Sequence, residues 1–292
     1  MKRPAPLPIR SVPLPSGKTR FVAILGWPLT YTLSPRLHNA ALRRHGLDAV
    51  YLALPSESPA SFRALARGLM LSPGFVGANI TNPHKLSACA LGLELSPAAR
   101  AIGAVNTLAR GPKGSWVGHN TDAAGFLEAL RLSKVRVKGA RVLVLGAGGA
   151  ARAAVWAGAQ AGARRIVVLA RRRAQARATA ALAGNCGLSG DLVEGSAALA
   201  SVGADLVVNS LPGEALGGRF GACLARRAKK GAAAMDLSYS PPRTAFLHEA
   251  GLRGWREIPG LDMLVEQGRE AFALWFGFKP ERRPSDLGLR KV

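Results

Sequence analysis

The stretch VLVLGAGGAAR, residues 142–152, joins an apolar run to a glycine-rich turn and an alanine-rich segment. The run Arg141–Leu145 predicts a buried strand, and Ala150–Ala161 predicts a helix. Gly146 permits the sharp turn between them, Gly148 lets a pyrophosphate approach the backbone, and the helix N-terminus offers unpaired N–H groups. Because strand, turn and helix follow in the required order, the stretch predicts a dinucleotide site rather than an ordinary tight turn.

The residues after the next predicted strand indicate which dinucleotide is bound. An NAD site usually carries an acidic residue about 20 positions further on, where it bonds the ribose 2′-hydroxyl. Here no acidic residue occurs between Glu128 and Asp191, and positions 170–173 read ARRR. Guanidinium groups pair with a 2′-phosphate, so the sequence predicts NADP(H) as the cofactor. Arg171 is the first choice for this contact and Arg172 the second; the alternative is a solvated arginine-rich turn.

Strands and helices alternate along the chain, which indicates an α/β class with a parallel or mixed sheet. The predicted strands are the run from Phe21 to Gly26 and then 49–54, 74–80, 141–145, 165–169, 205–209 and 233–237. The predicted helices are the segment from Ser34 to Gly46 and then 61–70, 150–161, 175–182 and 261–275. We expect a flexible basic tail over 1–19, a substrate domain over 20–121 and 261–285, and a Rossmann domain over 122–260.

Length and composition limit the class of protein. A chain of 292 residues with 48% apolar residues can build two cores, which excludes a disordered chain. Three scattered cysteines give no disulfide framework and no zinc motif, so no metal is expected. No apolar run reaches the roughly 18 residues of a membrane span, and we expect a soluble cytoplasmic protein without a membrane partner.

The formal net charge of +23 raises the question of a nucleic-acid partner. The basic residues are spread from Arg3 to Lys291, however, and aromatic residues make up only 6% of the chain, which leaves few rings for base stacking. Attraction of small anions explains the charge better. We therefore expect a small-molecule substrate and do not expect nucleic acid as the main partner; the chain could be a monomer or a homodimer.

The first half of the chain carries polar residues near predicted strand ends and in loops, where α/β sheets place their ligands. They are Thr32, Ser34, Asn79, Thr81, Lys85, Asn106 and Asp122. Each has an ordinary structural alternative, such as a helix cap, a turn residue or a surface lysine. Spacing alone does not choose between these alternatives and a substrate site.

Seven segments, taken in order, resemble the successive motifs of the shikimate dehydrogenase family. They are GWPLTYTLSPRLHNAALRRHGLDAVY, GANITNPHK, IGAVNTL, GHNTDAAGF, GAGGAAR, MDLSYSPPRT and GLDMLVEQG, and they extend from about residue 21 to 277. The resemblance implies an N-terminal α/β substrate domain, a Rossmann NADP domain and a C-terminal helix that returns to the first domain. It also implies the reversible NADPH-dependent reduction of 3-dehydroshikimate to shikimate.

The resemblance further implies roles for individual residues. Lys85 and Asp122 match the family's catalytic pair, in which an ammonium group can donate a proton to the carbonyl oxygen beside an orienting carboxylate. The residues that match substrate-binding positions are Thr32, Ser34, Asn79, Thr81, Asn106, Tyr239 and Gln267. Those expected to bind the cofactor are Gly146, Ala147, Gly148, Gly149, Ala150, Arg171, Arg172, Leu237 and Gly260.

Two departures from the family pattern leave alternatives open. Tyr31-Thr32 stands where His-Ser is usual, and Leu211 stands where Thr is usual. A paralogue that acts on quinate or aminoshikimate is therefore one alternative. A basic nucleic-acid-binding protein on an inactive dehydrogenase fold is another, although it has no need for Lys85 and Asp122. A third is a different NADP enzyme such as a folate dehydrogenase, which leaves the NITNPHK and HNTD segments unexplained.

Overall fold

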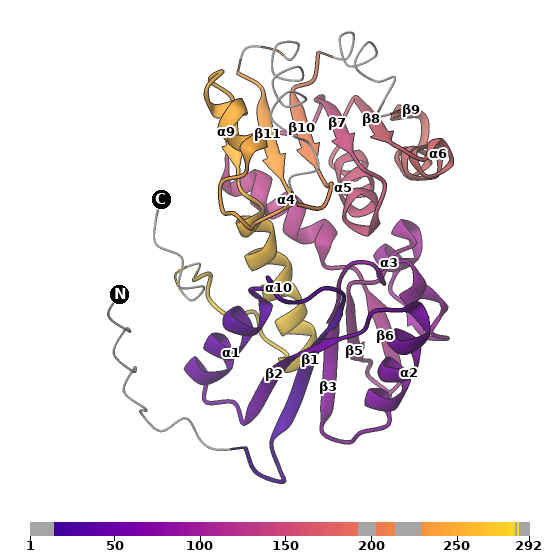
Figure 1. Cartoon of the computed structure of the whole chain (residues 1–292), viewed down its shortest axis with the longest axis vertical. Helices are drawn as coiled ribbons and strands as arrows, with labels where there is room; N and C mark the ends of the chain where they lie inside the picture. The colour runs from indigo at the N-terminus through magenta and orange to yellow at the C-terminus, as the bar shows by residue number, and fades with distance from the viewer. Residues whose placement is uncertain (1–14, 192–202, 214–228, 230, 284, 286–292) are drawn as a thin grey trace.

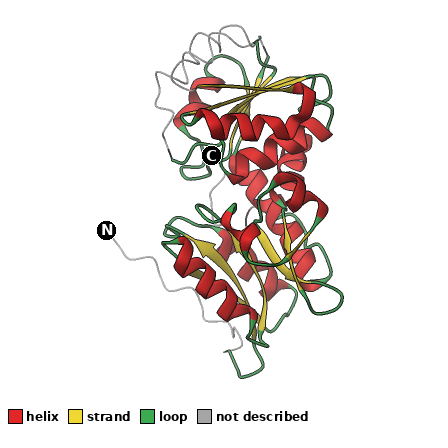
Figure 2. Ribbon diagram, turned by 90° about the vertical axis from the view of Figure 1, so that its right-hand side faces the viewer, coloured by secondary structure: helices red, strands yellow, loops and turns green. Residues whose placement is uncertain are grey.

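The computed structural model describes residues 15–191, 203–213, 229, 231–283 and 285. They form two β-sheets with helices on their faces, one sheet from each half of the chain, which confirms the predicted α/β class (Figure 1). Helices α4 (Asp122–Leu132) and α10 (Gly260–Phe276) pack side by side between the sheets (Figures 1 and 2). Most of the predicted tail lies outside the described residues.

The second sheet contains the glycine-rich stretch and is parallel throughout, in the order β12-β11-β10-β7-β8-β9. Its strands are β7 (Arg141–Leu145), β8 (Arg165–Ala170), β9 (Gly187–Asp191), β10 (Leu206–Asn209), β11 (Ala233–Asp236) and β12 (Arg256–Ile258). The chain builds outward from β7 on one side and then returns to add β10 on the other. In α/β sheets, ligands generally bind where the strand order reverses in this way, which is here at the carboxyl ends of β7 and β10.

Both faces of the second sheet are covered, which explains the unbroken apolar runs in its strands. Val142 and Val144 face a core shared with α4, α5 (Gly149–Gln160) and α6 (Arg173–Ala180). Leu143 and Leu145 face the opposite core with α9 (Ala245–Gly251). A short 3₁₀ turn, η2 (Ala181–Cys186), leads from α6 into β9.

The first sheet has the order β2-β1-β3-β5-β6-β4 and is mixed. Its strands are β1 (Arg20–Gly26), β2 (Ala49–Pro55), β3 (Phe75–Ile80), β4 (Glu94–Leu95), β5 (Thr107–Arg110) and β6 (Trp116–His119). Strands β1, β2 and β3 are parallel, whereas β5 runs antiparallel to both β3 and β6. The sequence analysis did not predict the β5–β6 hairpin, which carries Asn106 at its entrance.

Helices enclose the first sheet from both faces. On one face lie α2 (Pro59–Met70), the 3₁₀ turn η1 (Ser87–Ala90) and α3 (Pro97–Ile102). On the other face lie α1 (Ser34–Arg44) and the C-terminal part of α10. The predicted return of the last helix to the first sheet is thus confirmed, because Trp275 Nε1 donates a hydrogen bond to the carbonyl of Leu108 at 2.9 Å. In the described part of the chain, no helix has both the length and the apolarity needed to cross a bilayer.

Candidate active site

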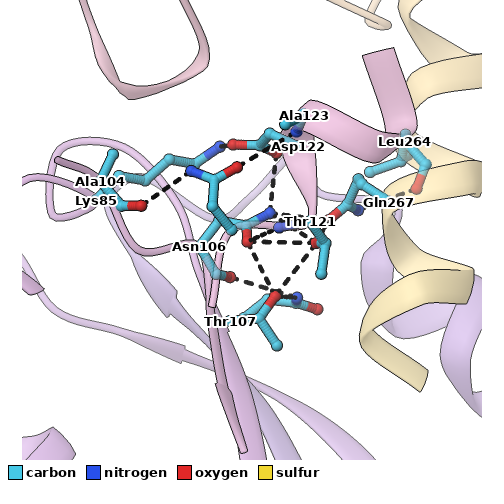
Figure 3. Close-up of polar contacts among 11 residues, drawn as sticks. Lys85, Ala104, Asn106, Thr107, Thr121, Asp122, Ala123, Leu264 and Gln267 are labelled. Atoms are coloured by element: carbon cyan, nitrogen blue, oxygen red, sulfur yellow. Dashed lines mark hydrogen bonds and ion pairs between the residues drawn. The ribbon is translucent and has the colours of Figure 1, made fainter. Parts of the chain in front are cut away.

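A buried ion pair lies at the centre of the polar residues predicted for the site. Lys85 Nζ donates a hydrogen bond to Asp122 Oδ2 at 2.7 Å, and the two side chains are 16% and 5% exposed. Lys85 follows β3 in a loop, whereas Asp122 is the first residue of α4, so the two come from different elements (Figure 3). Charged side chains are rarely buried to this extent, so the pair differs from an ordinary ion pair on the protein surface.

Asn106 fixes the other oxygen of the same carboxylate. Its Nδ2 donates to Asp122 Oδ1 at 2.9 Å and to Thr121 Oγ1 at 2.9 Å, while its Oδ1 accepts from the backbone N–H of Thr121 at 2.7 Å (Figure 3). Thr107 Oγ1 also donates to Asn106 Oδ1, at 3.0 Å. Asn106 therefore links the start of β5 to the start of α4 by hydrogen bonds, and it orients Asp122 toward Lys85.

Gln267 reaches this network from the last helix. Its Oε1 lies 3.4 Å from both Asn106 Nδ2 and Thr121 Oγ1, and its Nε2 donates to the carbonyl of Leu264 within α10 (Figure 3). The helix approaches α4 closely at Gly125, where an added Cβ would lie 2.8 Å from Gln267 Cβ. The structure thus brings together residues that lie about half the chain apart in sequence.

The topology of the first sheet explains why the predicted residues converge. The chain places β2 beside β1 and then returns to add β3 on the other side of β1. The carboxyl ends of β1 and β3 therefore lie at the point where α/β sheets generally bind their ligands. Thr32 and Ser34 follow β1, and Asn79, Thr81 and Lys85 lie at the end of β3 or just after it. Thr81 packs its methyl group against Gly26, where no side chain could be accommodated.

Asn79 and Ser34 belong to a buried cluster of side chains that also contains a tyrosine and a histidine. Tyr51 Oη donates to Asn79 Oδ1 at 2.7 Å, and the ring of His38 stacks on that of Tyr51 with centroids 4.4 Å apart. Burial raises the pKa of Tyr51 well above its usual value, and a hydrogen bond with Ser34 opposes this shift. Burial also lowers the pKa of His38 to about 3, so its ring is neutral.

Thr32 and Tyr239 contact each other although they lie in different halves of the chain. Burial raises the pKa of the Tyr239 hydroxyl, and a hydrogen bond with the Thr32 side chain opposes the shift. The charge of an ionised Tyr239 would also raise the pKa of Tyr51, which places the two hydroxyls near each other. Ser34, Thr32, Tyr51 and Tyr239 thus form a group of neutral hydroxyl donors, suited to a carboxylate or to ring hydroxyls.

The glycine-rich turn lies at the carboxyl edge of the second sheet and fits a dinucleotide phosphate. Gly146 has φ +106°, and its Cβ would overlap Ser210 Oγ, so this position requires glycine. Gly148 forms the N-cap of α5 without a side-chain cap, and no atom lies within 4 Å of its Cβ position. The N–H groups of the first turn of α5 thus have no side-chain cap, and a phosphate site uses such unpaired N–H groups.

The remaining predicted cofactor residues surround the same edge. Arg171 and Arg172 follow β8 and are exposed, so a 2′-phosphate could reach them from solvent. Ala147 accepts a hydrogen bond from Thr179, and Ala150 lies in the first turn of α5. Leu237 follows β11 and is partly buried, and Gly260 begins α10 where an added Cβ would lie 2.5 Å from the carbonyls of Asp236 and Ser238.

Sequence reasoning missed three polar residues of the site: Tyr51, Thr107 and Thr121. Tyr51 lies within the predicted strand 49–54, whose other residues are apolar and give no sign of a polar role. Thr107 directly follows Asn106, and Thr121 directly precedes Asp122. This adjacency to predicted site residues is the only feature of the sequence that indicates a role for the two threonines. Among the described residues, no cluster of three His, Cys, Asp or Glu side chains could hold a metal ion.

Comparison with known proteins identifies the family. The shikimate dehydrogenase (NADP(+)) of Hyphomonas neptunium is 38% identical to this chain over 276 residues, which cover 94% of this chain and 98% of that protein. The chain belongs to the shikimate dehydrogenase family. The shikimate dehydrogenase substrate binding domain matches residues 24–108, and the shikimate 5′-dehydrogenase C-terminal domain matches residues 260–284.

Other members of the shikimate dehydrogenase family support the same assignment. The enzyme of Acidiphilium cryptum is 42% identical, with 91% of this chain and 93% of that protein aligned. The crystal structure of shikimate 5-dehydrogenase from Thermus thermophilus, in complex with NADP(H) and shikimate, superposes with a TM-score of 0.78 at 35% identity. That superposition covers 92% of this chain and 97% of the other.

Proposed function

We propose that this chain catalyses the reversible NADPH-dependent reduction of 3-dehydroshikimate to shikimate, acting as a soluble cytoplasmic enzyme on a small-molecule substrate. The observation that carries the proposal is the ion pair of Lys85 and Asp122, 2.7 Å apart and nearly buried, opposite the glycine-rich turn of the second sheet. Family membership supports it, since the three relatives described above are all named as shikimate dehydrogenases.

The residues present fit NADP(H). The N–H groups of the first turn of α5 would hold the pyrophosphate, and Arg171 with Arg172 would hold the 2′-phosphate. When bound, the dinucleotide supplies the hydride for the ring carbonyl. The side chain of Lys85 contacts Gly149 in this same turn, since the added-Cβ position lies 2.8 Å from Lys85 Cβ, so the lysine lies beside the proposed cofactor site.

The protein's own part of the reaction is to bind the ring and to move one proton. As an ammonium group, Lys85 can donate a hydrogen bond to the carbonyl oxygen and then the proton that the developing alkoxide needs. Asp122 holds Lys85 through one carboxylate oxygen while Asn106 holds the other. In the oxidative direction the pair accepts the proton from the ring hydroxyl. Its preset geometry avoids reorganisation during the reaction.

The proposed substrate carries one carboxylate and several hydroxyls. The side chains predicted to bind it are hydroxyls and amides, which can donate hydrogen bonds to both kinds of group. We assign the carboxylate to Ser34, Thr32 and Tyr239. The proposed partners of the ring hydroxyls are Asn79, Thr81, Asn106 and Gln267. Thr32 keeps the hydroxyl of the usual serine and adds a methyl group. Leu211 packs near Gly146, where its Cδ2 lies 3.3 Å from the added-Cβ position. Thr32 therefore bears on the fit of the substrate, whereas Leu211 lies beside the turn proposed to hold the cofactor.

The experiment that tests the proposal compares shikimate with quinate, each with NADP⁺ and with NAD⁺, on the purified protein. We expect the highest kcat/KM with shikimate and NADP⁺. Preference for quinate, or for NAD⁺, would overturn the assignment of substrate or of the arginines, respectively. A salt-dependent shift of DNA without any dehydrogenase activity would instead favour a nucleic-acid-binding protein.

Lys85→Ala tests the role of the lysine. Loss of general acid–base help should lower kcat by about 10² to 10⁴ fold and leave the affinity for NADP⁺ almost unchanged. Lys113→Ala, at an exposed lysine in the turn between β5 and β6, is the matched control and should keep full activity. If Lys85→Ala turns over at the normal rate, the proton comes from another group and the proposed mechanism is wrong.

A further inference from the structure

The first turn of α5 touches the other half of the molecule at the proposed proton donor. If Gly149 carried a side chain, its Cβ would lie 2.8 Å from Lys85 Cβ and 3.0 Å from Lys85 Cδ. Both distances are shorter than ordinary carbon–carbon contacts of about 3.5–4.0 Å. The crowded atoms belong to the stem of the lysine, including the carbon next to its backbone, so rotation of the flexible end alone cannot relieve the contact. Only glycine lets Lys85 lie where it does.

A second contact from the same helix lies one turn further on. Arg152 Nε donates a hydrogen bond to the carbonyl of Ile102 at 2.7 Å. Ile102 ends α3, where the last carbonyls have no partner within the helix and favour a cationic donor. Gly103 follows with φ +66°, and a Cβ there would lie 2.8 Å from Arg152 Nη2. The guanidinium group therefore fits closely into the end of α3.

We infer that Gly149 and Arg152 are positioning residues: they fix the first turn of α5 against the first sheet, so that Lys85 is held in reach of Asp122. The inference rests on the proposed function, because it assigns them their effect through Lys85. The same turn supplies the N–H groups for the dinucleotide phosphate, so one rigid element sets both the cofactor and the lysine. A misplacement of about 1 Å at such a site can lower the rate up to about 10² fold.

Gly149→Ala tests the contact with Lys85. We expect kcat for shikimate at saturating NADP⁺ to fall at least about tenfold. Because Gly149 also belongs to the turn proposed to bind the pyrophosphate, the Kd for NADP⁺ is measured separately, so that weaker cofactor binding is not counted as a loss of kcat. Gly158→Ala is the matched control on the same helix, since its Cβ would meet only Ile166 Cδ1, at 3.3 Å. It should keep a normal kcat. A ligand-free crystal structure of Gly149→Ala should place Lys85 Nζ more than about 4 Å from Asp122 Oδ2.

Arg152→Ala tests the second contact without touching either ligand site. We expect it to lower kcat in the native background but not in the Lys85→Ala background, because a residue that acts through Lys85 has no effect once the ammonium group is gone. Arg152→Lys keeps a cationic donor and should recover part of the rate. This variant also keeps the test usable if Arg152→Ala does not fold. Equal losses in both backgrounds would mean that Arg152 is merely structural.

A readout independent of turnover separates this inference from the proposed function. Acetic anhydride labelling followed by peptide mass spectrometry measures how exposed Lys85 is, and Gly149→Ala and Arg152→Ala should both label Lys85 faster than the native protein does. If the native protein does not oxidise shikimate but the labelling rates rise, the proposed function fails and the positioning contacts stand. If turnover is normal in the native protein and neither variant changes kcat or labelling, the positioning inference is wrong.

Discussion

The burial of His38 makes the free energy of unfolding depend on pH. It is 2% exposed, its ring stacks on Tyr51, and its pKa is lowered to about 3 from 6.5. Between these pH values the unfolded chain takes up a proton that the folded chain does not, so the free energy of unfolding falls as the pH drops from 6.5 toward 3. At pH 5 this one ring should account for a loss of about 2 kcal/mol relative to pH 7.

His38→Gln should therefore narrow the difference in unfolding free energy between pH 7 and pH 5 by about 2 kcal/mol, measured by urea denaturation at each pH. The same substitution at His45, exposed at the end of α1, controls for the loss of an imidazole. An unchanged difference in His38→Gln would show that the buried ring does not govern this part of the pH profile.

The pairing of Lys85 with Asp122 followed from the resemblance and not from spacing, because 37 positions separate them and nothing local indicates that they meet. The role of Tyr51 could not be found from the sequence for a different reason. A tyrosine in an apolar strand looks the same from sequence whether or not its hydroxyl has a polar partner. Only the registers of β1 with β2 and with β3 set Tyr51 near Asn79. The roles of the predicted site residues stay predictions until the variants are measured.

At the scale of elements, α10 depends on one glycine in the first sheet. A Cβ on Gly77 would overlap both the carbonyl of Leu108 and Nε1 of Trp275, which hydrogen bond to each other at 2.9 Å. Gly77→Ala should therefore break a buried hydrogen bond and push the helix outward, at a cost of about 3 kcal/mol in unfolding free energy.

Urea denaturation measures this effect, with Gly74→Ala as the control. Gly74 lies just before the same strand, and its nearest neighbour, Phe21 Cε1, lies 3.6 Å from the added-Cβ position, an ordinary contact. If Gly77→Ala is as stable as Gly74→Ala, then Trp275 does not anchor α10 to the first sheet.

The parallel strands and the glycine-rich turn could be predicted because each is a short run whose pattern fixes its structure. The predicted helix 150–161 is α5 within one residue at each end, and the predicted strand 74–80 is β3 with one residue fewer. The hairpin of β5 and β6 could not be predicted in this way. Strands β5 (TLAR) and β6 (WVGH) mix polar and apolar residues, unlike the equally short and mainly apolar strands β10 and β11 of the second sheet, and their place in the first sheet depends on the pairing of β5 with β3.

At the scale of the whole molecule, the formal charge of +23 should govern how fast the cofactor is captured. NADPH carries several negative charges and shikimate only one, so the field of the protein acts more strongly on the former. Raising the salt from 50 to 500 mM should lower kcat/KM for NADPH by about tenfold and that for shikimate by much less, because exposed charges are screened. Steady-state kinetics over this range measures both, and equal dependence for the two ligands would contradict the prediction.

Helix α10 is the last long helix to be synthesised, yet it closes the core of the half that is made first. Until residues 260–276 leave the ribosome, the face of the first sheet formed by Val22, Ile24 and Ala109 lacks the covering side chains of Ala271, Phe272 and Trp275. The N-terminal half of the nascent chain must therefore wait, with part of its apolar interior uncovered, while the whole dinucleotide half is translated. The order of synthesis thus makes this half the longest exposed to chaperones and to aggregation.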